Sequence, residues 1–504
     1  MADLKSLGFL LAGAGAFYIG LSILRTQTET YKLRHIPTIG PNGFISSYFG
    51  RFQFMKHARE MIQEGYDRYR GRAFKVRTPE QWVVVVTSED MINDIKKASD
   101  NYLSFDLAVK DNLQQDYTMG KTTYLHRYHL DLVKTTLTRN ISVRFPDVRD
   151  EIVAAFTDEI PAQSDWVCYT ALSTVMTIVS RTTNRLFVGL PLCRDPDYVN
   201  LNIEFTVDVF KSAAIINMFP GILHPLVGPL LSPLSSTMKR AMKHLGTTIQ
   251  DRLNREDESG SDWDGRPNDL ISWLLDENPQ GELRSVKEIL LRVLQINLAA
   301  IHTTSMAFTN ILFHVCVQPP EVIAALREEV ESVVEEHGWT KVSMGYLRKM
   351  DSFMKEVARM VGTSATVIDR KVLKDFTFSD GTTLPTGARV AVPAFNLHRD
   401  ENNYEDPLQF KPFRFYDLRS GEGESIKHQM ITPTTEYFFF GAGKHACPGR
   451  FFAVNELKTL LAHTLLTYDV QFEDGRKTVP DPVWFSRDIG PDRDVKVMFR
   501  KRRN

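Results

Sequence analysis

One cysteine stands in a sequence context that suits metal ligation. Residues 440–450 read Phe-Gly-Ala-Gly-Lys-His-Ala-Cys-Pro-Gly-Arg, and an amphipathic helical pattern follows over residues 452–465. This order predicts a glycine-rich loop that presents Cys447 near the start of a long helix. A helix N-terminus carries partial positive charge and free N–H groups, which favour thiolate over thiol. Gly441 and Gly443 would let a large planar group approach the backbone closely.

A second group of polar residues lies inside a long apolar helical pattern over residues 286–317. Its middle reads Leu-Ala-Ala-Ile-His-Thr-Thr-Ser, which places His302 and Thr303 among apolar neighbours. A hydroxyl both donates and accepts hydrogen bonds, and an imidazole titrates near neutrality, so both side chains could take part in chemistry. A helical Ser or Thr can instead simply bond to the carbonyl four residues earlier.

Three charged residues form the third pattern. Glu356 and Arg359 are three positions apart, which places both on one face of a predicted helix. Taken alone, such a pair is a common surface feature. Downstream, the segment Pro-Phe-Arg-Phe contributes Arg414.

Taken together, these patterns resemble those of the cytochrome P450 monooxygenases. The pattern F-x-x-G-x-x-x-C-x-G is met by Phe440, Gly443, Cys447 and Gly449, and is similar to the haem-thiolate loop of that family. The resemblance makes Cys447 the axial ligand of a haem iron. It also implies that Phe440 packs against the haem and the loop, with Gly441 contributing to the haem contact.

The resemblance extends to the polar stretch of the long helix. There Ala300 stands for the glycine, His302 for the acid and Thr303 for the proton-relay alcohol of the stretch A-G-x-D/E-T-T. The histidine departs from the general family pattern, although the form Ala-Ile-His-Thr-Thr is similar to that of fungal members. His302 is either the outer member of a proton relay or a residue that only packs between helices.

The same resemblance assigns structural and haem-binding roles. Glu356, Arg359 and Arg414 match the elements E-x-x-R and P-E-R-F, and would form a buried network that fixes the haem loop. Contacts to the haem propionates are implied for four further residues, namely Arg370, His445, His129 and Lys134. For His129 and Lys134, a solvated basic helix face is the alternative.

The N-terminus carries a charge-free apolar stretch, Leu7–Leu24, which is at the short end of a membrane span. A cleaved signal peptide is the alternative. One basic residue precedes the stretch and three follow it, namely Lys5 against Arg25, Lys32 and Arg34. This asymmetry predicts a single-pass anchor with the bulk of the chain in the cytosol. The resemblance implies the endoplasmic reticulum membrane.

The remaining chain is predicted to be one mainly α-helical domain with a small β portion. We expect an anchor at residues 1–25, a proline-rich hinge and linker at 26–52, and a catalytic domain at 53–504. The four cysteines do not suggest a disulfide framework. The formal net charge of −1 gives no basis for nucleic-acid binding.

Local patterns predict the elements of this domain. Hairpins are expected within 73–87 and 376–392, and residues 100–122 read as a long loop. Segment 215–231 is either a core-packed loop or an apolar, membrane-dipping entrance. Helices are expected at 53–70, 124–140, 148–160, 168–190, 198–215, 235–255 and 286–317.

The activity implied by the resemblance is insertion of one oxygen atom from O₂ into a lipophilic substrate at haem b. Electrons would come from NADPH through a separate cytochrome P450 reductase, because the chain has no glycine-rich dinucleotide fingerprint. A P450 that isomerises or dehydrates its substrate is an alternative that His302 keeps open. Others are a non-catalytic haem- or lipid-binding membrane protein and a hydrolase using the Cys447 thiolate.

Five segments are candidates for substrate contact, and most of them are apolar. This composition suits a terpenoid- or steroid-like fungal secondary metabolite, but does not identify it or the carbon attacked. The segments are 100–120, 205–231, Ile296 with Asn297, 361–367 and 483–489.

Overall fold

The structure is a computed structural model. It describes residues 13, 17, 20–21, 23–24, 27–43, 46–421 and 423–503. Most of the predicted anchor, Leu7–Leu24, lies outside these residues, so the transmembrane helix stays a prediction. Within the described part, one helix is long and apolar enough to cross a membrane, and it is α14, Val286–Val317, which is mostly buried inside the protein.

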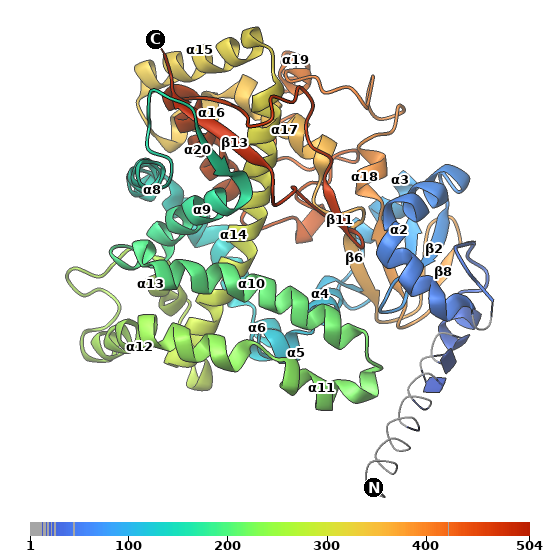
Figure 1. The fold of residues 1–504 in the computed structure, drawn as a ribbon. Coiled ribbons are helices and arrows are strands. Elements are labelled where there is room, and N and C mark those ends of the chain that lie inside the picture. Colours follow the sequence, from blue (N-terminus) through green and yellow to red (C-terminus); the bar gives the residue numbers. More distant parts are fainter. Residues whose placement is uncertain are drawn as a thin grey trace, which may run out of the picture.

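Helices make up most of the molecule, as predicted (Figure 1). In the first half they are α2 Ser46–Arg68, α3 Glu89–Lys97, α4 Phe105–Leu113, α5 Gln115–Thr118, α6 Thr122–Leu125, α7 Tyr128–Leu132, a π-helical turn Val133–Leu137, α8 Thr138–Glu159, α9 Ala171–Phe187, α10 Pro196–Asn217, α11 His224–Leu231 and α12 Leu234–Ser259. In the second half they are α13 Leu270–Asp276, α14, α15 Pro320–His337, α16 Lys341–Tyr346, α17 Arg348–Val361, α18 Ala394–Leu397, α19 Arg414–Leu418 and α20 Arg450–Thr467.

The strands form one larger sheet and three small ones. The six-stranded sheet has the order β1 Thr38–Ile39, β2 Ala73–Arg77, β3 Trp82–Val86, β9 Arg389–Val392, β6 Val367–Val372 and β4 Leu103–Ser104. The others are β10 Tyr468–Phe472 with β13 Lys496–Lys501 and β5 Val167–Thr170, β11 Val483–Phe485 with β12 Asp488–Gly490, and β7 Phe376–Thr377 with β8 Thr383–Leu384. The predicted hairpins are present as the antiparallel pairs β2–β3 and β7–β8.

Helix α14 is the centre of the helical part, and in Figure 1 it runs in yellow through the middle of the fold. Helices α9, α10, α12, α17 and α20 all pack against it. The Ser285 hydroxyl accepts from the Glu288 N–H and caps its first turn. The Glu288 carboxylate binds Arg292 at 2.7 Å, four residues on along the helix. The sheet lies to one side of this helical body, with β2, β6 and β8 on the right in the figure.

The predicted loop at 100–122 was wrong, because this segment contains α4, α5 and α6. The Ser104 hydroxyl caps α4 by accepting from the Leu107 N–H at 3.2 Å. These helices have at most nine residues, so they show little sequence periodicity and depend on packing against neighbours. The predicted helix at 124–140 is likewise interrupted, by a break after α6 and by the π-helical turn.

The segment 215–231 is not packed into the core. It comprises the end of α10, a 3₁₀ turn at Gly221–Leu223 and α11. Large apolar side chains on it are strongly exposed, with exposed fractions of 70% for Ile222, 67% for Leu226 and 80% for Leu230. The structure therefore excludes the core-packed alternative for this segment.

Candidate functional site

The cysteine loop, residues 440–450, is folded by its own backbone. The Cys447 N–H donates to the Phe440 carbonyl at 2.8 Å, which closes the loop. Gly441 and Gly443 adopt φ values of +70° and +65°, which suit glycine. Helix α20 starts at Arg450, so Cys447 precedes the helix by three residues, as predicted.

The charge environment of the Cys447 thiol differs in part from the prediction. Burial raises the pKa of this thiol above its usual value. The N–H groups of Gly449 and Arg450 and the Arg450 guanidinium lower it, as expected at a helix start, but by less than burial raises it. The helix terminus alone does not hold a thiolate here. A bound metal ion would supply the missing positive charge, because a coordinating thiol is deprotonated.

Neighbouring elements hold the loop from two sides. A Cβ at Gly443 would lie 3.4 Å from the Lys96 carbonyl oxygen, so the end of α3 approaches the loop closely there. A Cβ at Gly449 would lie 3.6 Å from Val133, at the start of the π-helical turn. A larger residue at Gly443 would meet both backbone strain and a fixed backbone atom.

The middle of α14 has a face that the protein does not cover. Ala299 and Thr303 are exposed and Ala300 is half-buried, although Leu298, Ile301 and Thr304 are buried. The Thr303 hydroxyl donates to the Ala299 carbonyl at 2.7 Å, so its oxygen remains able to accept. The predicted relay alcohol is thus accessible on a mostly buried helix.

His302 lies on a different part of this helix. Its Nε2 donates to the Ile203 carbonyl of α10 at 2.9 Å. Burial lowers the pKa of His302, and the hydrogen bond to Ile203 opposes this effect. The geometry favours the packing alternative over the proton relay.

Two of the predicted propionate contacts meet at one aromatic ring. The Arg370 guanidinium lies 5.4 Å from the centroid of Phe105 on α4, and the His445 ring lies 5.2 Å from it. The Nε2 of His445 donates to Asp100 at 2.7 Å. Burial lowers the pKa of His445, so this ring is neutral at pH 7. Arg370 is 3% exposed and brings a nearly buried positive charge beside the cysteine loop.

The other two propionate candidates differ from each other. His129 on α7 is 1% exposed, and neither ring nitrogen has a hydrogen-bond partner in the described part of the chain. Burial lowers the pKa of His129 to about 3. A buried neutral imidazole with an unused N–H is suited to donate to a bound ligand. Lys134 is exposed on the π-helical turn, which agrees with the alternative that it lies on a solvated basic helix face.

The three charged residues of the third pattern are in direct contact. Arg359 forms two hydrogen bonds with the Glu356 carboxylate, both of 2.8 Å, and Arg414 Nε lies 3.0 Å from the same carboxylate. Glu356 and Arg359 have no measurable exposure. Such a buried arrangement fixes geometry strongly, because removing one partner leaves the others unpaired.

His398 was missed by sequence reasoning, although it joins this network to the cysteine loop. Its carbonyl accepts from Arg359 Nη1 at 2.6 Å, and its Nε2 accepts from the Phe438 N–H at 2.9 Å. Phe438 lies two residues before the loop, and its N–H is buried. A single histidine after α18 carries no local signal of this contact, because its partners are about forty residues away on either side.

A haem fits these residues. Within the described chain, no cluster of three or more His, Cys, Asp or Glu side chains could hold a metal ion. Cys447 would hold the iron of a haem through its thiolate. The glycine turns, the uncovered face at Thr303, the unpaired His129 ring and the buried Arg370 suit that macrocycle and its carboxylates.

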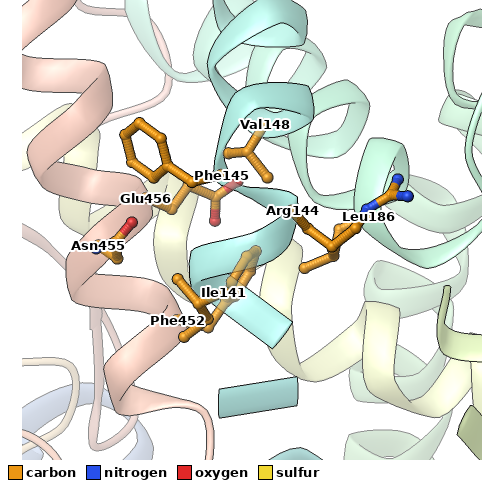
Figure 2. Close-up of a pocket in the computed structure, with 8 residues that line it drawn as sticks. All are labelled: Ile141, Arg144, Phe145, Val148, Leu186, Phe452, Asn455 and Glu456. Carbon is orange, nitrogen blue, oxygen red and sulfur yellow. The ribbon is translucent and has the colours of Figure 1, made fainter. Parts of the chain in front are cut away.

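A small cavity lies away from this site, between α8, α9 and α20. Figure 2 shows side chains from these helices around it, including Glu456. Its volume of about 10 Å³ has room for at most one water molecule, so it is not a substrate site. The carboxyl group of buried Glu456 accepts from the Thr183 hydroxyl at 3.1 Å.

Comparison with known proteins agrees with this geometry. A family profile described as "Cytochrome P450" matches residues 41–490. The chain belongs to the cytochrome P450 family. Over its full 504 residues this P450 is 42% identical to cytochrome P450 monooxygenase 151 of Postia placenta, with 100% of both chains covered. The resemblance to fungal P450 monooxygenases is thereby confirmed.

More distant relatives match almost as completely. The P450 is 32% identical to cytochrome P450 monooxygenase CYP512U6 of Ganoderma lucidum, covering 94% of this chain and 92% of that protein. It is 31% identical to cytochrome P450 monooxygenase paxQ of Penicillium paxilli, covering 97% and 96%. The chain is thus a cytochrome P450 monooxygenase, an enzyme class that uses haem, O₂ and electrons from a reductase.

Proposed function

We propose that this monooxygenase oxidises a terpenoid- or steroid-like fungal secondary metabolite at haem b, with electrons from NADPH delivered by NADPH–cytochrome P450 reductase. The observation that supports an oxygenation reaction is the accessible Thr303 hydroxyl on the uncovered face of the mostly buried helix α14. An isomerase or dehydratase does not require an alcohol at this position. The lipophilic substrate class rests on the apolar composition of the predicted contact segments.

Different residues of the chain would have different roles in this reaction. A haem held by Cys447 would supply oxygen activation by an iron with a strongly donating thiolate ligand. Thr303 Oγ1 would hold a water molecule or a proton near the reacting oxygen, since it can accept while donating to Ala299. Arg370, His445 and His129 would bind the haem carboxylates. His302, bound to Ile203, would only join α14 to α10.

We propose that the enzyme is a single-pass protein of the endoplasmic reticulum membrane, anchored by Leu7–Leu24 and facing the cytosol. The basic residues after this stretch support the orientation. The exposed apolar residues from the end of α10 through α11 support a second contact with the membrane surface, because such a patch suits lipid better than water. They are Ile215, Met218, Ile222, Leu226 and Leu230.

A carbon-monoxide difference spectrum of the reduced protein tests the haem assignment. The thiolate-ligated Soret shift is expected in the wild type and absent in Cys447→Ser. Turnover of a terpenoid panel with and without added reductase tests the monooxygenase, with one oxygen atom gained per product. A product of unchanged composition formed without reductase would instead identify an isomerase.

Protease protection on microsomes tests the topology. The catalytic domain should be digested without detergent, because it is expected in the cytosol. Glycosylation of Asn140, which lies in the sequon Asn-Ile-Ser, would contradict this orientation.

A further inference from the structure

A continuous line of side-chain contacts joins four separate segments of the fold. Asn217 at the end of α10 donates to the Asn112 carbonyl at 2.8 Å. Asn112, near the end of α4, donates from its amide to Asp369 of β6 at 3.2 Å. Arg487, between β11 and β12, pairs with the same Asp369 oxygen at 2.7 Å. We refer to Asn217, Asn112, Asp369 and Arg487 as the polar clasp.

Two further residues reinforce the clasp. Arg389 Nη2 donates to the Asn112 side-chain oxygen at 2.8 Å and lies 3.4 Å from Asp369. Gln114 donates from its amide to the side-chain oxygen of Asn217 at 2.5 Å. Asn112 thus uses its backbone carbonyl and both polar ends of its side chain. It is the residue through which α10 and β6 are joined.

The centre of the clasp is an ion cluster with little access to water. The side chain of Asp369 is 12% exposed and that of Arg389 is 4% exposed. Burial alone would raise the pKa of Asp369, but the charges of Arg487 and Arg389 outweigh it and lower this pKa to about 2. Asp369 is therefore ionised at neutral pH and pairs with two guanidinium groups, the buried one of Arg389 and the partly exposed one of Arg487.

All four segments border the candidate site. Helix α4 carries Phe105, the ring shared by Arg370 and His445. Helix α10 binds His302 of α14 through Ile203, next to Thr303. In the β11–β12 hairpin, a Cβ at Gly490 would lie 3.5 Å from Met306 of α14. Strand β6 carries Arg370 beside Asp369.

We propose that the polar clasp positions these four segments around the substrate and sets how fast a bulky ligand enters and leaves the site. This inference rests on the proposed function. The outermost link, Asn217 to Asn112, joins α10 to α4 just before the exposed turn that leads to α11. Breaking it frees the end of α10 without disturbing the ion cluster. In Figure 1, α10 and α11 lie on one side of α4, and β6 lies on the other.

The chain offers a matched pair of variants for a test. Asn217→Ala removes the outer link, and Asp369→Asn weakens the central ion cluster while keeping its shape. Lys371→Met is the control, because Lys371 joins β6 to α4 through Asp111 at 2.5 Å but is partly exposed. An ion pair that water reaches contributes little, so the loss of this partly exposed pair should leave the segments in place.

Stopped-flow binding to the holoenzyme provides the first measurement, with clotrimazole as a bulky haem-ligating probe and imidazole as a small one. We expect Asn217→Ala to raise the clotrimazole dissociation rate about five- to hundredfold, the range expected when the two hydrogen bonds of Asn217, to Asn112 and from Gln114, are lost. Asp369→Asn should raise it further. Imidazole rates should change less than about twofold, and Lys371→Met should match the wild type for both probes.

Hydrogen exchange provides a measurement that needs neither haem nor turnover. Amides of residues 105–113 and 210–217 should lose protection in Asn217→Ala but not in Lys371→Met. Unchanged protection and unchanged clotrimazole rates in Asn217→Ala would overturn the clasp, even if Asp369→Asn fails to fold. Equal changes for imidazole and clotrimazole would also overturn it, since they indicate a disturbed haem site. Loss of the proposed oxygenation itself would appear separately, in the wild-type spectrum and turnover.

Discussion

The Nε2 atom of His398 accepts the Phe438 backbone N–H at 2.9 Å. Because Nε2 accepts, the proton of the neutral ring is on Nδ1. Burial lowers the pKa of His398 to about 3, which keeps the ring neutral and able to accept. The backbone carbonyl of the same residue accepts from Arg359, so the buried charges and the cysteine loop are connected through one residue.

Replacing His398 should therefore weaken the loop without touching the haem face. In His398→Phe the Phe438 N–H stays buried and unpaired, at a cost of about 1–3 kcal/mol. We expect a smaller fraction of the protein to give the thiolate-ligated carbon-monoxide spectrum. His463→Phe is the control, since His463 is a buried ring that packs against Phe156 at 4.7 Å. Equal spectra for the two variants would show that the His398 hydrogen bond does not hold the loop.

Removing a member of the ion network should be more severe. Glu356→Ala leaves Arg359 and Arg414 without their shared carboxylate, at a cost of about 3–5 kcal/mol. That is a large part of a typical net stability. Little holoprotein should accumulate, as measured by haem content per polypeptide. Full haem content with normal melting would contradict the role of the network.

Thr303 should affect coupling more than binding. Thr303→Ala removes the accessible hydroxyl and keeps the apolar wall, so NADPH consumption should continue with less product and more peroxide. His302→Phe should give near-normal product per NADPH, because the ring packs against α10. If Thr303→Ala is fully coupled, this hydroxyl is not the proton-handling group. If His302→Phe is uncoupled, the relay interpretation of His302 returns.

Glu456 should make stability depend on pH in an unusual direction for an acid. Burial raises the pKa of Glu456 from 4.5 to about 8. Between these values the folded state keeps a proton that the unfolded state loses, so stability falls as pH rises from about 4.5 to about 8.

Glu456→Gln removes this loss and should still accept from Thr183. At pH 5 the melting temperature of the variant should be close to that of the wild type. At pH 8.5 its free energy of unfolding should exceed that of the wild type by roughly 2–4 kcal/mol, and its melting temperature should be higher. The control is Glu335→Gln, which alters an exposed residue of α15. A melting difference that does not grow with pH would show that Glu456 titrates normally.

The sequence predicted the elements with long, regular signals. The apolar pattern over 286–317 coincides with α14, and the cysteine loop precedes a helix as its glycines and proline indicated. The short helices α4 to α6 were not predictable from periodicity. The link at His398 and the polar clasp were not predictable either. Each joins residues far apart in the chain, and the sequence shows no pattern for such a contact.

The contacts of the cysteine loop have a consequence for the order in which the chain folds. His445 binds Asp100 across 345 residues of sequence, and a Cβ at Gly443 would lie 3.4 Å from the Lys96 carbonyl oxygen. A contact between residues so far apart in the sequence requires closure of a long loop, which costs conformational entropy before the contact stabilises the fold. Such contacts therefore form late in folding. During synthesis, the surface that receives the loop emerges from the ribosome long before the loop does. We therefore expect haem to bind only when the chain is nearly complete. A truncated chain would have the surface that receives the cysteine loop but would lack Cys447.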